Sequence, residues 1–306
     1  MKLKIIVGAL LLALCFCLTG CKSSEYKKAV SLQDAGDYHA AADLYQTLGD
    51  YQDSIARIET CNDYIAAIEA FEGAVVSLEK KNAELDAANE AAGEIAYSEV
   101  TALDESLRTS LETAISEAKA ARFETPEFPD ELSDILKATE QMNGTEYSAV
   151  LTNLVEKQSL LERSMKQFAL VNNPDEAYVI SCLRKIPGVI DIAVATEDND
   201  PNGQLHKAGG YTAAVFFSHE NVDQDSVYGT SLIDKGTAAG GQVEVYATPE
   251  DAAKRDTYLA AFDGSAFSSG SHIVLGTCVI RTSDELTASQ QNELTDSIIE
   301  ELIRID

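Results

Sequence analysis

The sequence predicts an α+β fold: an N-terminal helical bundle or set of coiled-coil-like hairpins, followed by a small α+β sandwich with a mostly antiparallel sheet. Two observations support this prediction. Apolar residues recur three and four apart over residues 64–171, which is the helical period. Residues 172–306 instead contain short runs of β-branched and aromatic residues separated by turn signals. The length of 306 residues suits about two domains.

The first residues have the features of an export signal. Lys2 and Lys4 precede an apolar run from Ile5 to Leu18, which is short for a permanent membrane-spanning helix. The run ends in small residues, as a secretory signal peptide does. We therefore predict a signal peptide over residues 1–20.

The end of this signal, Leu18-Thr19-Gly20-Cys21, resembles the lipobox of bacterial lipoproteins. In that family the cysteine is diacylated and becomes the mature N-terminus after cleavage. The resemblance implies a lipid on Cys21, a short tether over residues 21–25, and attachment to the extracytoplasmic face of the cell membrane. An ordinary signal with an incidental cysteine is the alternative.

The charge balance argues against one class of partner. The chain has 51 acidic and 23 basic residues and a formal net charge of −28. Cleavage of the predicted signal peptide would remove two of the basic residues, Lys2 and Lys4, and make the chain more acidic. Such a chain is repelled by phosphate backbones, so we expect no nucleic-acid binding. Its aliphatic content is too high for a disordered chain.

Cysteines are few in the expected mature chain. Apart from Cys21 they are Cys61, Cys182 and Cys278, which form neither a disulfide framework nor a zinc-site spacing. The apolar surroundings of Cys182 and Cys278 favour small buried hydrophobes, and a bridge between the two is the alternative.

A repeat of thirteen residues opens the helical part: Gly36-Asp37-Tyr38, Gly49-Asp50-Tyr51 and Asn62-Asp63-Tyr64. The period predicts one short helix and one tight turn in each unit. The stretch "GDYHAAADLYQTLGDY" resembles a tetratricopeptide helix hairpin. The resemblance covers about one repeat, residues 26–61, and we predict a short helical repeat over residues 26–63. Because about three such repeats are needed to build a groove, we expect a short helical cap.

Residues 64–171 are expected to form a helical bundle or hairpin stalk. The first apolar stripe includes Leu78 and Leu85, and it also carries Asn82 and Asn89, polar residues that specify register in coiled coils. We expect the stripes to pack on one another, and a partner-binding face is the alternative. The predicted helices cover residues 64–96, 100–118, 132–143 and 147–168.

Residues 172–306 are expected to form the α+β head domain. Asn173 is the predicted cap of its first helix, and Thr248-Pro249 is predicted to open a helix that runs to Phe262. A further helix closes the chain. The element order suits a sheet with its helices on one face. The predicted strands are "VIDIAVAT", "GYTAAVFFS", "QVEVYAT" and "HIVLGTCVIRT".

The segments "TEDNDPNGQL", "GGYTAAVFFS", "VEVYATPEDAAKRDTYLAAFDG" and "SGSHIVLGTCVIRTSDELTASQQ" resemble a family of exported lipoproteins of Gram-positive gut bacteria. The resemblance covers most of residues 60–306. The resemblance implies an extracytoplasmic localisation and a fold, and it implies no activity.

Catalytic motifs do not stand out in the sequence. Ser271, His272 and Asp263 could form a hydrolytic group, but adjacent side chains on a strand point to opposite faces, which favours a solvated loop end. The pairs Gly209-Gly210 and Gly240-Gly241 are expected to serve bends or close backbone approach, and room for a ligand is the alternative.

The loop "EDNDPNGQL" at 197–205 is the candidate for a metal site. Asp198, Asp200 and Asn202 alternate as in a calcium loop, but Gly209 stands where an EF-hand places its bidentate glutamate. The loop is therefore not an EF-hand. A β-turn is the favoured interpretation, and a calcium site completed by acidic groups from elsewhere is the alternative.

These observations together predict a lipoprotein anchored to the cell membrane through Cys21, with a non-enzymatic binding or interaction role at the cell envelope. Envelope proteins are its expected partners. The alternatives are a solute-binding or calcium-binding lipoprotein and an envelope hydrolase.

Overall fold

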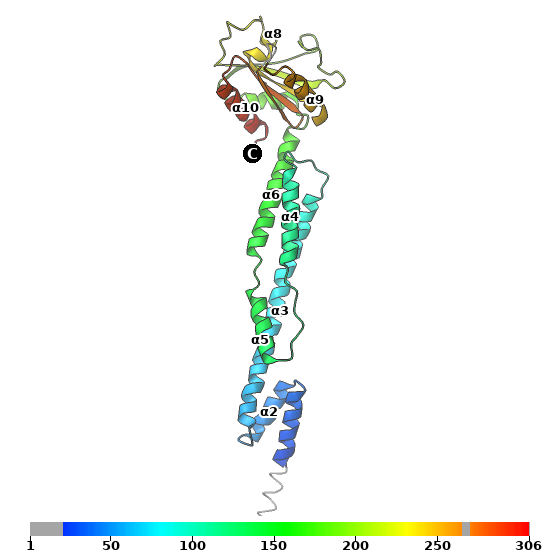
Figure 1. Ribbon diagram of the computed structural model, residues 1–306, viewed down its shortest axis with the longest axis vertical. Coiled ribbons are helices and arrows are strands. Elements are labelled where there is room, and N and C mark those ends of the chain that lie inside the picture. The colour runs from blue at the N-terminus through cyan, green and yellow to red at the C-terminus, as the bar shows by residue number, and fades with distance from the viewer. Residues whose placement is uncertain (1–20, 265–269, 306) are drawn as a thin grey trace, which may run out of the picture. The chain divides into compact units, whose positions relative to one another are not determined.

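The computed structural model describes residues 21–264 and 270–305, and the predicted signal peptide lies outside these ranges. The chain forms two compact units (Figure 1). One contains the chain up to Glu90 together with Ser116–Asn153, and the other contains Ala91–Ile115 together with the chain from Leu154. None of the described helices has the length and apolar character needed to cross a membrane.

Three helical segments begin the first unit: residues 21–34, α2 (Tyr38–Leu48) and the start of α3 (Ser54–Ala96). Gly36 and Gly49 adopt positive φ angles of +80° and +62°, as the predicted tight turns require. The third predicted turn, at Asn62-Asp63-Tyr64, is wrong, because α3 runs through it without a break. Cys61 and Ala67 on either side are both buried, so helical packing outweighs the turn signal.

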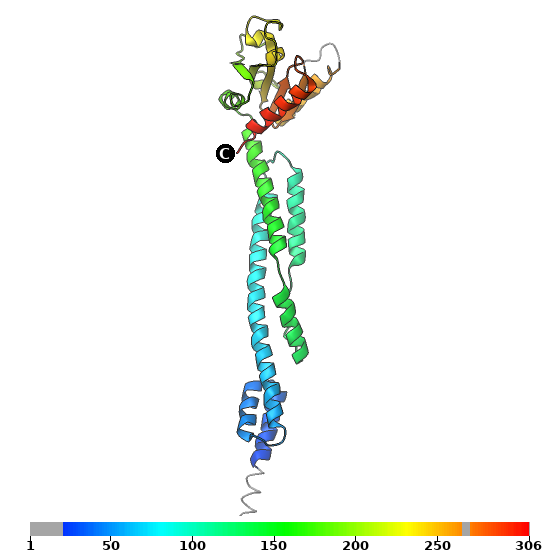
Figure 2. The same ribbon diagram turned by 90° about the vertical axis from the view of Figure 1, so that its left-hand side faces the viewer.

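The predicted stripe on α3 is buried in the first unit. Leu78 and Leu85 are fully buried, and Asn82 is 4% exposed. Phe71 and Leu78 pack against apolar residues of α5 (Leu132–Gly144), which lies beside α3 in Figures 1 and 2. The stripe is therefore a packing face, as expected.

The predicted start of α4 was too early. This helix covers Ser106–Ala121, and Val100 lies ahead of it and is 55% exposed. The carboxylate of Asp104 accepts a 3.0 Å hydrogen bond from the amide of Ser106 and so marks the start of the helix. Arg108 on α4 donates to the carbonyl oxygens of Ala96 (2.5 Å), the last residue of α3, and of Ser98 (3.1 Å), which follows that helix.

The C-terminal domain, in the second unit, is built on a five-stranded sheet in which every neighbouring pair is antiparallel. The predicted α+β class is confirmed. The stretch "HIVLGTCVIRT" is a hairpin rather than one strand, because Gly276 turns the chain with a φ of +60°. The strands, in sheet order, are β1 (Val189–Val194), β2 (Tyr211–His219), β3 (Gly240–Tyr246), β5 (Cys278–Thr282) and β4 (Ser271–Leu275).

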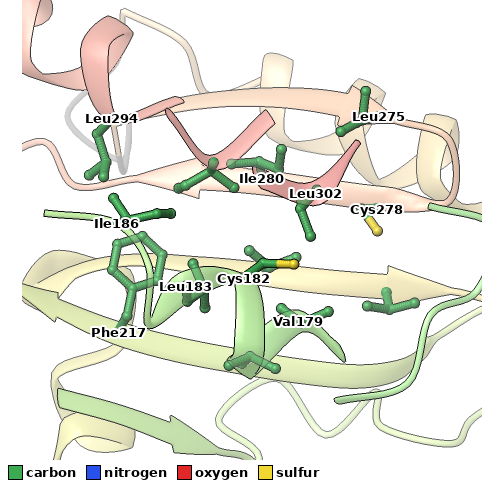
Figure 3. Close-up of a cluster of buried hydrophobic side chains, with 14 of the residues drawn as sticks. Val179, Cys182, Leu183, Ile186, Phe217, Leu275, Cys278, Ile280, Leu294 and Leu302 are labelled. Atoms are coloured by element: carbon green, nitrogen blue, oxygen red, sulfur yellow. The ribbon is translucent and has the colours of Figure 1, made fainter. Parts of the chain in front are cut away.

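Helices cover both faces of this sheet, so the prediction of a single helical face is wrong. One core cluster joins α7 (Glu176–Leu183) and α10 (Ala288–Leu302) to the sheet (Figure 3). A second cluster joins α8 (Leu232–Lys235) and α9 (Pro249–Ala260) to the other face. Strand β3, which follows the short 3-10 helix η1 (Gly236–Ala239), is buried along its whole length because both faces are covered.

Helix α7 begins later than predicted. Asp175 is its cap and accepts a 2.7 Å hydrogen bond from the amide of Tyr178, whereas Asn173 has a positive φ of 52° and lies before the helix. The cap Thr248 and the first residue Pro249 of α9 are as predicted.

The turn between β4 and β5 is fastened to the end of α6 (Ser148–Leu170). Thr277 donates to the carbonyl oxygen of Val171 through its amide (2.9 Å) and its hydroxyl (3.0 Å). The amide of Asn173 in turn donates to the Thr277 hydroxyl (2.6 Å). These contacts join the helical segment of the second unit directly to its sheet.

Candidate functional site

A pocket of about 370 Å³ lies in the C-terminal domain. One wall is the loop that contains Asn202, Gln204 and Gly209, and a second is the paired ends of β2 and β3 at Tyr211 and Tyr246. Helix α9 forms the third wall. We call this cavity the α9 pocket.

Helix α9 presents one face to the pocket. Asp251, Lys254, Arg255 and Tyr258 are spaced at i, i+3, i+4 and i+7, which places them on the same side of a helix. Lys254 is largely exposed and pairs with Asp251 at 2.8 Å. The capped N-terminus at Thr248 fixes where this face begins.

Behind the pocket lies a buried ion cluster around Glu244. The Glu244 side chain has no solvent exposure, and Arg255 holds its carboxylate with two 2.8 Å hydrogen bonds, from Nε and Nη2. Arg281 Nη1 lies 3.2 Å from the same carboxylate, and the hydroxyl of Tyr246 donates to it at 2.8 Å. A buried carboxylate requires such partners, because its charge is otherwise strongly disfavoured away from water.

The cluster shifts the pKa values of its members. Burial lowers the pKa of Arg255, but the hydrogen bonds and charge of Glu244 outweigh this effect and raise it overall. Burial, with a contribution from the Arg255 charge, lowers the pKa of Arg281. Burial and the Glu244 charge raise the pKa of Tyr246, so its hydroxyl remains a donor at neutral pH.

Sequence reasoning did not identify Glu244, Arg255 and Arg281 as a group. The available signal was a glutamate between valines in the predicted strand "QVEVYAT". An acidic side chain at the centre of an apolar strand requires a buried cation, but the sequence does not say which one.

Asp200 organises the loop that forms the first wall. Its carboxylate accepts hydrogen bonds from the amides of Asn202 (3.1 Å), Gln204 (2.6 Å) and Leu205 (2.9 Å) and from the hydroxyl of Tyr211. Burial works to raise the pKa of Asp200, but these four hydrogen bonds outweigh it and lower the pKa overall. The carboxylate of Asp200 therefore holds the backbone of this loop in one conformation.

The proposed calcium ligands are not gathered into a shell. Asp198 and Asn202 are exposed, and Asp200 is engaged by the four donors described above. The nearby Glu197 carboxylate lies 3.0 Å from His206 Nδ1. Over residues 21–264 and 270–305, no group of three or more His, Cys, Asp and Glu side chains is arranged to hold a metal ion. The calcium site stays a prediction.

The two glycine pairs have different surroundings. Gly209 and Gly210 line the α9 pocket, and a Cβ on Gly210 would lie 2.0 Å from the carbonyl oxygen of Gln204. A Cβ on Gly241 would lie 2.3 Å from the ring of Phe217, so this pair serves close packing. Close backbone approach is confirmed for both pairs, and the first pair also borders a cavity.

The hydrolytic group considered from the sequence, Ser271, His272 and Asp263, is only partly assembled. His272 Nδ1 lies 2.6 Å from Asp256, and its Nε2 lies 3.4 Å from Asp263. Ser271 instead hydrogen-bonds the hydroxyl of Thr282 at 2.6 Å. As expected from strand geometry, the serine does not contact the histidine.

The cysteines behave as small hydrophobes. Cys61, Cys182 and Cys278 are buried and free, so the alternative of a Cys182–Cys278 bridge is wrong. Burial raises the pKa of the Cys278 thiol to about 12. Cys21, the predicted lipidation site, is exposed, and the described residues 21–34 are helical.

Comparison with known proteins gives no match: no family model fits the sequence, and neither the curated proteins nor the solved structures contain a significant relative. The fold class and the geometry of the α9 pocket are therefore the basis for a functional proposal.

Proposed function

We propose that this protein is a lipoprotein, anchored by Cys21 to the extracytoplasmic face of the cell membrane, whose C-terminal domain binds a small polar solute without transforming it. The observation that carries the proposal is the α9 pocket, in which an arginine is held in place by a fully buried glutamate. The lipobox-like sequence at Cys21 supports the address.

The size and lining of the pocket support solute binding. Small-molecule sites in proteins are concave and have volumes of roughly 300–1,000 Å³, with a few fixed polar groups that orient the ligand. The α9 pocket, at about 370 Å³, lies in this range. Its polar groups are held by hydrogen bonds, as in the pairs Tyr211–Asp200 and Arg255–Glu244, so little order must be gained on binding.

The chemistry of the lining favours binding over catalysis. The tyrosine hydroxyls donate to carboxylates, and burial raises the pKa values of Tyr211 and Tyr246. A phenol held in its protonated form is a donor rather than a nucleophile or base. Among the described lining residues, the charged side chains form ion pairs, Lys254 with Asp251 and Arg255 with Glu244.

A thermal-shift screen of small polar solutes against the full-length protein in detergent would test this proposal. Ligand binding raises the melting temperature in proportion to the logarithm of ligand concentration. The variant Tyr258→Ala, which removes a pocket side chain that is 57% exposed, should lose the response. The control Tyr228→Ala, at a 96% exposed tyrosine outside this pocket, should retain it. Solutes that stabilise wild type and Tyr258→Ala equally would contradict the proposal.

A further inference from the structure

The guanidinium of Arg255 is only partly used by the protein. Arginine has five N–H groups, and Glu244 accepts from Nε and from one hydrogen of Nη2. Both hydrogens of Nη1 and the second hydrogen of Nη2 have no acceptor among the described residues. Because Arg255 lines the α9 pocket, these groups form a second donor fork at the pocket.

The carboxylate of Glu244 is shared between two cations. It contacts two guanidinium groups, those of Arg255 and Arg281, so it does not serve Arg255 alone. The pocket is where an anion has access to Arg255, although the chain as a whole has a formal charge of −28.

Two neighbours add to this site. The ammonium of Lys254 lies at the pocket with its side chain 76% exposed, and it offsets the negative charge of Asp251, which also lines the pocket and pairs with it at 2.8 Å. The Tyr258 ring centroid lies 5.4 Å from Cζ of Arg255, a cation–π contact that places the ring beside the guanidinium. The exposed part of the same ring offers an apolar surface to the carbon skeleton of a ligand.

We propose that the solute bound in the α9 pocket carries a carboxylate, which the free Nη1/Nη2 fork of Arg255 receives through two parallel N–H···O hydrogen bonds. The planar fork matches a planar carboxylate in shape and charge. This inference rests on the proposed solute-binding function and names its ligand class. Lys254 strengthens the attraction, and Tyr258 flanks the ligand.

Calorimetric titration of the full-length protein in detergent would test the inference with a matched pair of probes. Galacturonate and galactose differ by a carboxylate, and succinate and inorganic phosphate are titrated beside them. We expect galacturonate or succinate to bind and galactose to bind at least tenfold more weakly. Lys254→Ala should weaken carboxylate binding about fivefold, because it removes an exposed positive charge and leaves the carboxylate of Asp251 unopposed at the pocket. Lys185→Ala, which removes a half-exposed lysine outside this pocket, is the matched control.

Arg255→Lys keeps the positive charge and loses the fork, so carboxylate affinity should fall at least tenfold while the melting temperature reports whether the fold remains. If that variant does not fold, Lys254→Ala still decides the matter. Equal binding in Lys254→Ala and Lys185→Ala would overturn the inference, as would binding of phosphate alone. If galactose binds as well as galacturonate and Tyr258→Ala abolishes both, the carboxylate class is wrong and the solute-binding function survives. If no solute of any class binds, both fail.

Discussion

The hydroxyl of Tyr147 donates a 2.6 Å hydrogen bond to Oδ1 of Asn82, in the buried interior of the first unit. The amide of Phe123 donates to the same hydroxyl (2.8 Å), and Asn82 Nδ2 donates back to the Phe123 carbonyl oxygen (3.0 Å). Three residues thus close a ring of hydrogen bonds between α3, the chain after α4 and the start of α6. A buried polar network that is fully satisfied specifies one arrangement of its elements.

Tyr147→Phe should destabilise the helical part measurably. The substitution leaves Asn82 Oδ1 and the Phe123 amide without this partner, which costs about 1–3 kcal/mol when such groups are buried. Urea unfolding followed by circular dichroism at 222 nm would measure the loss. Tyr97→Phe, at a tyrosine that is 68% exposed, should change stability by less than about 0.5 kcal/mol. Equal midpoints for the two variants would show that the ring of hydrogen bonds contributes nothing.

Replacement of Leu78 and Leu85 by Asp should melt the first unit, because both side chains are fully buried on α3. We expect a loss of helical circular dichroism and of the cooperative transition. Val76→Asp is the matched control on the same helix, since Val76 is 68% exposed. A double variant that melts like the control would mean that burial of this stripe does not hold the unit together.

Cys21→Ser should prevent lipid attachment. The protein should then appear in the medium or accumulate as an unprocessed precursor. Metabolic labelling with a fatty-acid precursor, followed by fractionation, measures both effects. If the Cys21→Ser variant is labelled as strongly as wild type, acylation at this cysteine is excluded.

Asp200 should stabilise the C-terminal domain at neutral pH, and this stabilisation should be lost in acid. The pKa of Asp200 is lower in the folded state, so its stabilising contribution is fully present above the unfolded-state value of about 3.9. The contribution is lost as the pH falls through the lower folded-state pKa. Asp200→Asn should therefore be less stable than wild type at pH 7, and the difference should shrink toward pH 2. Urea titrations of both proteins across this range measure it, and a constant difference would contradict the assignment.

Calcium should leave the melting temperature unchanged if the 197–205 loop is only a turn. A bound ion at about a hundred times its dissociation constant would add about 2.7 kcal/mol, which is easily detected. Asp198→Ala is the informative variant, because it removes a candidate ligand and leaves the hydrogen bonds of Asp200 in place. A calcium-dependent rise in wild type that this variant lacks would establish the metal site.

Local patterns predicted much of the fold. The apolar period of α3 placed Leu78 and Leu85 in the interior, and Thr248-Pro249 marked the start of α9. Local signals failed where packing decides, as at Asn62, where the helix continues. The pocket was harder still: Glu244, Arg255 and Arg281 are far apart in sequence. They meet through the register of β3 with β5 and the packing of α9 on the sheet, which composition and period do not encode.

The fastening of Thr277 to Val171 and Asn173 has a mechanical consequence. Three hydrogen bonds join the turn between β4 and β5 to the residues just after α6, two of them to the carbonyl oxygen of Val171. A Cβ on Gly276 would lie 2.6 Å from the same oxygen, so the two segments are in close contact. Contacts of this kind transmit force between the helix and the hairpin and restrict rotation of one against the other. Tension applied along α6 would reach β5 directly, and through β5 it would act on Arg281 and the charge cluster behind the pocket.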